Sequence, residues 1–180
     1  PLRSRGPGPG PDLPPQTRSL ASEHDRRAGA RKVEFLKGEI DHIPLPDNSV
    51  DVIISTCVVT LAGDKRQVLH EAFRVLRPGG RFAISDVVVR GDVPDAVRKN
   101  MELWIGCVAG ALEEQEFLSL LTEAGFEDPS IEPTRVYAVE DAATFLAGTG
   151  LDVAAIASQI EGEFMSAFVR GTKPANTAAA

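Results

Sequence analysis

Apolar runs separated by polar turns recur along this chain and predict alternating strands and helices. The clearest run, from Val50 to Leu61, follows a turn of Pro, Asp, Asn and Ser and is rich in β-branched residues. Such a run is typical of a strand buried on both faces of a parallel sheet. Cys57 lies at the carboxyl end of this strand. Because ligands collect beyond the carboxyl ends of strands in open α/β sheets, Cys57 is where chemistry would be expected. For a cysteine taken by itself, the more common role is that of a small buried hydrophobic residue.

Apolar residues that recur at spacings of three and four predict helices. One helix begins at Asp64, keeps this spacing through Leu76 and stops at residues 77–80, Arg-Pro-Gly-Gly, because proline cannot continue a helix and glycine tolerates positive φ. A second amphipathic helix covers Glu113 to Ala124 and ends at Gly125. Further helices are expected over residues 95–104, 141–145 and 153–160.

Shorter apolar runs predict the other strands, at Val33 to Leu36, Arg81 to Val89, Ile131 to Val139 and Phe164 to Gly171. Pro133 places the third of these near a sheet edge, since proline cannot donate to a strand ladder. Gly106 and Gly110 mark a loop around Cys107. Strands that alternate with helices favour a layered α/β domain with a largely parallel sheet.

Length and composition narrow the class of protein. A chain of 180 residues, 43% of them hydrophobic, suits one domain with a real core. No stretch approaches the roughly 20 apolar residues needed to cross a bilayer, so we expect a cytoplasmic protein without a membrane partner. A net charge of −7 disfavours a nucleic-acid surface. Two cysteines cannot make a disulfide framework and are expected to bind or react as thiols.

The ends of the chain differ in composition from its middle. Residues 1–28 are rich in Pro, Gly and Arg and are predicted to be disordered, as are residues 175–180. The predicted domain occupies residues 29–174. Because the chain does not begin with Met, we expect a fragment or a processed or misread N-terminus.

Several sequence elements together resemble one enzyme family. Gly38-Glu39-Ile40, the run from Leu45 to Ser55 and residues 74–81, Arg-Val-Leu-Arg-Pro-Gly-Gly-Arg, are similar to the middle of class I S-adenosylmethionine-dependent methyltransferases. Residues 54–59, residues 104–112 and residues 164–174 resemble the arsenite methyltransferases more specifically. The resemblance covers residues 29–174 and implies a Rossmann-like sheet with helices on both faces.

The resemblance also implies a chemistry for the two cysteines. Trivalent arsenic is a soft centre that selects thiolate ligands, and Cys57 and Cys107 would be its two protein ligands. Its lone pair would attack the methyl group of S-adenosylmethionine, which makes a general base unnecessary. A third thiol would come from an upstream cysteine or from glutathione, and a thiol reductant such as glutathione or thioredoxin is an expected partner. The role of the protein would be to hold the arsenic and the methyl group close together in the geometry of attack.

In the same resemblance, Gly38, Glu39 and Ile40 form the turn beside the adenine of the cofactor, with Ile40 against the ring and the Glu39 carboxylate near the amino group. Ser55 and Thr56 would approach the methionine moiety, and Thr56 stands where many relatives have asparagine. The alternative for Glu39 is a solvated loop carboxylate.

For three other residues, a role in the binding site is weighed against a purely structural role. Asp86 follows Ile84-Ser85 and is either a polar group of the pocket or a turn residue. Trp104 either shields the arsenic site or belongs to the core. His70 has no metal-ligand spacing to another His or Cys and is expected at the surface or the edge of the core.

The upstream glycine-rich cofactor loop of the family, its acidic ribose-binding residue and its first two strands have no counterpart before Val33. We therefore expect cofactor binding to be weak or absent, which would leave the chain inactive. In the family the strand order is three, two, one, four, five, seven, six, with the seventh antiparallel. The strand at Val33 to Leu36 would then either pair directly with the strand at Val50 to Thr56 or leave that strand as a bare edge. Two functional alternatives remain, a methyltransferase for a small organic acceptor and a non-catalytic arsenite-binding remnant.

Overall fold

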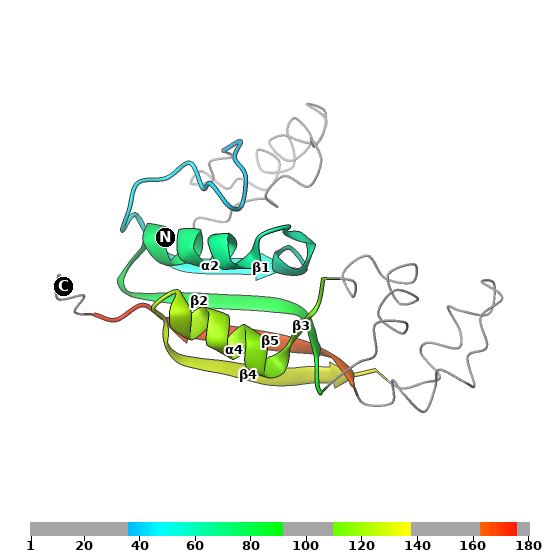
Figure 1. The fold of residues 1–180 in the computed structure, drawn as a ribbon. Helices are drawn as coiled ribbons and strands as arrows, with labels where there is room; N and C mark the ends of the chain where they lie inside the picture. The colour runs from blue at the N-terminus through cyan, green and yellow to red at the C-terminus, as the bar shows by residue number, and fades with distance from the viewer. Residues whose placement is uncertain (1–35, 92–109, 138–162, 176–180) are drawn as a thin grey trace, which may run out of the picture.

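The computed structural model describes residues 36–91, 110–137 and 163–175 (Figure 1). The described chain forms one mixed sheet with the strand order β1-β2-β5-β4, and the short strand β3 pairs with β2 off this path. The strands are β1 (Val50–Thr56), β2 (Leu76–Val89), β3 (Leu112–Glu113), β4 (Glu127–Val136) and β5 (Phe164–Thr172). The helices are a 3-10 turn η1 (Val59–Leu61), α2 (Lys65–Val75) and α4 (Glu114–Glu123).

The sheet reproduces the last four strands of the expected order. Strand β2 runs parallel to β1, while β5 is antiparallel to both β2 and β4. These strands correspond to four, five, seven and six of the family, so the expected antiparallel seventh strand is confirmed. Strand β4 ends the sheet, as Pro133 predicted.

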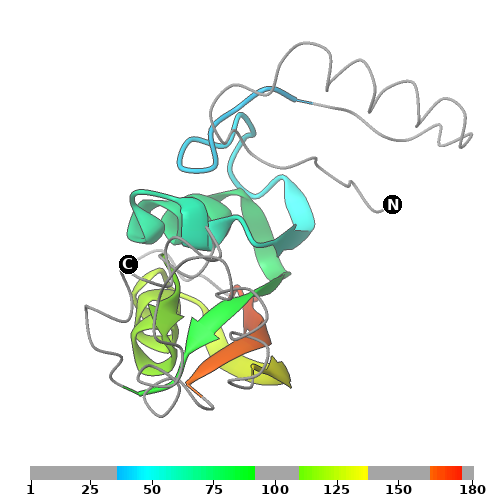
Figure 2. The ribbon, with the colours of Figure 1, turned by 90° about the vertical axis from the view of Figure 1, so that its right-hand side faces the viewer.

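Both described helices cover the same face of the sheet, as Figure 2 shows. Their apolar sides join the strands in one core, in which Leu69 of α2, Phe117 of α4 and Ile84 of β2 are almost fully buried. Phe126 closes the core beside Phe73, with ring centroids 5.3 Å apart. The helices predicted over residues 95–104, 141–145 and 153–160 lie outside the described residues. No helix that the structure describes is long and apolar enough to span a bilayer.

The predicted start of α2 and the predicted end of α4 are both confirmed. Asp64 caps α2 by accepting a hydrogen bond from the backbone N–H of Gln67 at 2.9 Å. Helix α4 ends before Gly125, whose φ of +100° is the left-handed conformation that favours glycine after a helix.

Three boundary predictions are wrong. Strand β4 begins at Glu127 and not at Ile131, and it ends at Val136, so that Tyr137 lies outside it. Leu76 lies in β2 and not in the helix, because its ψ of 140° is already extended. Residues 77–80 therefore open β2, which was expected to begin only at Arg81. Leu36 is exposed and belongs to no strand, while the rest of the strand predicted at Val33 lies outside the described residues. Strand β1 has no partner on its outer side among the described strands.

Candidate functional site

The carboxyl end of β1 lies beside Ser85 of β2, which continues to Val89, and brings Cys57 to the sheet edge. Thr56 pairs with Ser85 in the parallel ladder, and the Cys57 N–H donates to the Ser85 carbonyl at 2.9 Å. Cys57 is half-buried and has a φ of +50°, the left-handed region that residues with a side chain seldom adopt. Such a conformation costs roughly 1–3 kcal/mol and persists only where its surroundings enforce it. The backbone therefore reverses sharply at Cys57.

Beneath the loop that follows Cys57, the Asp86 carboxylate is buried with 2% exposure. It accepts hydrogen bonds from the Thr60 hydroxyl at 3.0 Å, the Thr60 N–H at 3.3 Å and the Val87 N–H at 2.9 Å. Burial raises the pKa of Asp86, and these hydrogen bonds oppose the rise. Asp86 is therefore not a turn residue, because it lies within β2, and its buried carboxylate binds the loop after Cys57.

The chain re-enters the described structure at Gly110, directly against this loop. A Cβ placed on Gly110 would lie 1.8 Å from the Thr60 carbonyl oxygen, so only glycine allows the two backbones to approach so closely. Leu112 and Glu113 then pair with the C-terminal end of β2. The segments that follow the two cysteines thus meet at one sheet edge, although Cys107 and Trp104 lie outside the described residues.

A tightly closed turn is present at Glu39 to His42, where the family resemblance places the turn beside the cofactor. His42 donates its backbone N–H to the Glu39 carbonyl at 3.1 Å. Gly38 packs so closely on the ring of Pro44 that a Cβ would approach it to 2.3 Å. Ile40 packs against the core while Glu39 is exposed. The apolar side chain of Ile40 therefore lies next to the solvated carboxylate of Glu39.

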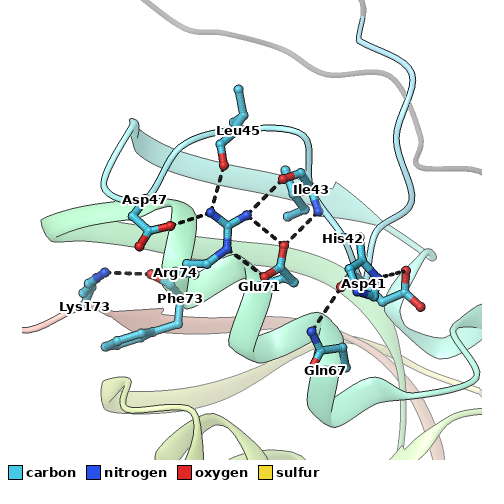
Figure 3. A network of polar contacts seen from close by, with 10 residues as sticks. All are labelled: Asp41, His42, Ile43, Leu45, Asp47, Gln67, Glu71, Phe73, Arg74 and Lys173. Atoms are coloured by element: carbon cyan, nitrogen blue, oxygen red, sulfur yellow. Dashed lines mark hydrogen bonds and ion pairs between the residues drawn. The ribbon is translucent and has the colours of Figure 1, made fainter.

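Residues 41–47, which we call the strap, run from this turn along α2 (Figure 3). Three helix residues one turn apart hold the strap, Gln67, Glu71 and Arg74. The Gln67 side chain donates to the Asp41 carbonyl at 3.2 Å, near the start of α2. At the other end of the helix, the Asn48 N–H donates to the Arg74 carbonyl at 3.0 Å. The strap thus runs in the same direction as α2, which places the turn beside the start of that helix, near the carboxyl end of β1.

Of the three helix residues, Arg74 makes the largest number of contacts with the strap, as Figure 3 shows. Its guanidinium donates to the carbonyls of Ile43 at 2.9 Å and Leu45 at 2.8 Å, and it pairs with Asp47 at 2.6 Å. It also forms a two-pronged pair with Glu71, at 2.7 and 2.9 Å. Glu71 in turn accepts the Ile43 N–H at 2.8 Å.

The Glu71–Arg74 pair shifts the titration of both groups. The hydrogen bond from Arg74 holds the pKa of Glu71 below its ordinary value despite the burial of the carboxylate, and the hydrogen bond from Glu71 raises the pKa of Arg74. Sequence reasoning missed this role, because polar residues at positions 67, 71 and 74 read as a solvated helix face. Their i, i+4, i+7 spacing was the available signal.

The remaining predicted residues are placed as follows. Ser55 is half-buried and Thr56 exposed, both at the end of β1. His70 is exposed on α2, as expected. Among the described residues, Glu39, Asp41 and His42 bring possible metal-ligand atoms within 4.8 Å of one another. Exposed acidic groups often gather in this way without an ion, and nothing else at the cluster indicates one.

Comparisons with known proteins agree with this geometry. A family model described as a methyltransferase domain matches residues 12–125. The arsenite methyltransferase of Halobacterium salinarum is 48% identical over 124 residues, which are 69% of this chain and 32% of that protein. The human arsenite methyltransferase is 34% identical over 115 residues, 62% of this chain and 31% of that protein. This chain thus spans about a third of the length of these curated relatives.

Solved structures show the same fold. The crystal structure of CrArsM, an arsenic(III) S-adenosylmethionine methyltransferase from Chlamydomonas reinhardtii, superposes with a TM-score of 0.68 at 32% identity, covering 91% of this chain and 54% of that one. The YcgJ protein of Bacillus subtilis shares the fold at 17% identity, with a TM-score of 0.66, and covers 91% of this chain and 80% of that one. With its strand order, its turn at Glu39 and these similarities, the chain belongs to the methyltransferase domain family and has the class I fold.

Proposed function

We propose that this chain takes part in methyl transfer from S-adenosylmethionine to trivalent arsenic held by cysteine thiolates, and so in arsenic detoxification. The observation that carries the proposal is the place of Cys57, held in a left-handed backbone conformation at the carboxyl end of β1. The similarity to arsenite methyltransferases supports arsenite as the substrate. Soft thiolates are the ligands that arsenic prefers.

The cofactor turn fits S-adenosylmethionine chemically. A half-buried Ile40 offers an apolar surface to an adenine ring, and the exposed Glu39 carboxylate can accept a hydrogen bond from an exocyclic amino group. When bound, the cofactor supplies an electrophilic methyl group on a sulfonium. The hydroxyls of Ser55 and Thr56, at the end of β1, are the groups that would contact its methionine end.

The work of the chain itself is to position the arsenic. Cys57 would hold it as a thiolate, with Cys107 as the second protein ligand and a small-molecule thiol such as glutathione as the third. The hydrogen bond from the Cys57 N–H to the Ser85 carbonyl fixes Cys57, the first arsenic ligand, relative to the strand end. Because the arsenic lone pair is the nucleophile, correct placement replaces a general base.

Arsenite titration by calorimetry tests the proposal on the full chain. We expect Cys57→Ser and Cys107→Ser each to weaken arsenite binding by about 100-fold, since each removes one of two thiolates, which corresponds to about 2.8 kcal/mol. Ser166→Ala, which changes a residue of β5, is the control and should bind as the parent chain does. Unchanged binding in both cysteine variants would contradict the proposal and favour an organic acceptor.

Transfer of a labelled methyl group is the second measurement. If the chain binds the cofactor without the upstream loop, label enters methylated arsenic when arsenite, glutathione and labelled S-adenosylmethionine are supplied, and Cys57→Ser abolishes this transfer. Tight arsenite binding without any transfer would contradict the catalytic part of the proposal and identify a binding remnant.

A further inference from the structure

Resting on the proposed arsenic site, we propose that Asp86 is a positioning residue for Cys57 and acts through Thr60. Asp86 does not touch the reacting atoms in this scheme. It holds the loop after Cys57 in the one conformation in which the cysteine stays at the strand end.

The backbone is fixed on both sides of the Cys57 reversal by consecutive residues of β2. Ser85 accepts the Cys57 N–H at 2.9 Å, and Asp86 binds Thr60, three residues further along the loop. Between these two points the chain leaves the extended conformation through Cys57 at φ +50° and then turns into η1. A left-handed residue with a side chain needs such support, because its strain would otherwise be relieved by a local backbone change.

A carboxylate suits the Asp86 position better than an amide does. Its oxygens accept from three donors, the Thr60 hydroxyl, the Thr60 N–H and the Val87 N–H. Asparagine has a single acceptor oxygen, and its NH₂ group would face one of these donors. Since Thr60 is only 3% exposed, water has little access to replace a lost bond. Asp86→Asn should therefore release the loop although it preserves the side-chain size.

Gly110 holds the loop from the opposite side. Its close approach to the Thr60 carbonyl leaves no space for a methyl group, since a Cβ at this position would come within 1.8 Å of the carbonyl oxygen. Thr60 is thus bound through its hydroxyl and N–H by Asp86 and is covered at its carbonyl by a second segment. Thr60 is therefore the residue through which both segments hold the loop after Cys57.

The experiment compares thiol chemistry with folding in the full chain. In a Cys107→Ser background Cys57 is the only thiol, and its reaction with a disulfide reagent such as DTNB reports its exposure. Thr60→Val removes the hydroxyl at nearly constant shape, and Asp86→Asn removes the carboxylate. Thr122→Val is the matched control, because its hydroxyl bonds to the Leu118 carbonyl at 2.9 Å on α4, away from the loop.

We expect Thr60→Val and Asp86→Asn to speed the Cys57 reaction at least threefold, well below the melting temperature, and to weaken arsenite binding about tenfold in the chain with both cysteines. Thr122→Val should change neither quantity, and Thr60→Ser, which restores a hydroxyl, should recover both. A purely structural role would lower the melting temperature and leave both quantities within twofold of the parent, which would overturn the proposal.

The outcomes separate this proposal from the one it rests on. If the parent chain does not bind arsenite, the proposed function fails, and the Cys57 reaction rate alone decides whether Asp86 positions the thiol. If Asp86→Asn does not fold, Thr60→Val decides it. A Thr60→Val chain that reacts at the parent rate overturns the positioning role in either case.

Discussion

Replacing Arg74 by leucine removes the guanidinium that holds the strap on α2 while keeping an apolar stem against the helix. The change takes the hydrogen-bond donor away from the carbonyls of Ile43 and Leu45, and it leaves Glu71, whose side chain is 12% exposed, without its ion-pair partner. Each buried polar group left without a partner costs about 1–3 kcal/mol. The Arg74 side chain is 31% exposed, so water can replace part of these bonds.

We therefore expect the free energy of unfolding to fall by about 2–4 kcal/mol. In a protein of this size, each kcal/mol lowers the melting temperature by about 2–4 °C, which gives a drop of roughly 4–16 °C. Thermal melting followed by circular dichroism measures the drop, and amide hydrogen exchange locates it. Relative to the parent chain, amide exchange should accelerate more in the strap and in the Glu39 turn than in β2.

Arg77→Leu is the matched control. Arg77 also pairs with an aspartate, Asp51 at 2.8 Å, but the two side chains are 51% and 68% exposed. Exposed pairs of this kind contribute under about 1 kcal/mol. Equal losses in the two variants, or an exchange change spread evenly over the sheet, would show that the strap contacts are not what stabilises this region.

Three further outcomes follow from the same structure. Because the folded pKa of Glu71 lies below the ordinary 4.5, its carboxylate stabilises the fold above about pH 4.5, and this contribution is lost as the pH falls through the lower folded value. Glu71→Gln should therefore show a smaller drop in melting temperature between about pH 6 and pH 3 than the parent chain, and an equal drop would contradict this. Lys173→Met should cost about 2–3 kcal/mol in denaturant unfolding, because the buried ammonium donates to the carbonyls of Phe73 at 2.8 Å and Leu76 at 2.9 Å, and a loss below about 0.5 kcal/mol would refute it. Ile54 is an apolar side chain, 67% exposed, on β1, which has no partner on its outer side among the described strands. Light scattering should therefore show less self-association for Ile54→Lys than for the parent chain, and no difference would argue against this.

The regular elements could be predicted from sequence because their signals are local. The apolar run of β1, the spacing of three and four in α2 and Gly125 after α4 each act over a few residues. The start of β2 was missed because Pro78 and Gly79 read as a stop and a turn, while in the folded chain the Gly79 N–H donates to the Lys173 carbonyl at 2.9 Å. That partner is remote in sequence and leaves no local pattern.

The candidate site divides in the same way. The position of Cys57 at a strand end followed from the strand itself, and the Glu39 turn followed from the family resemblance. The left-handed backbone at Cys57 could not be predicted, because it depends on Asp86, which lies 26 residues from its partner Thr60. The contacts of Arg74 with the strap were equally invisible, since they join residues 27 to 31 positions apart.

The first turn of α2 joins the two halves of the proposed site. The Gln67 N–H donates to Asp64, which ends the loop after Cys57, and the Gln67 side chain donates to the Asp41 carbonyl, next to the cofactor turn. The first turn of α2 therefore sets the distance between the loop after Cys57 and the turn at Glu39, through hydrogen bonds from Gln67. A rigid element holds reacting groups more closely to a fixed geometry than loops do, and methyl transfer to arsenic depends on such a geometry. On this reasoning, sequence changes within the strap should alter cofactor affinity and leave arsenite affinity intact, whereas changes at Gln67 should alter both.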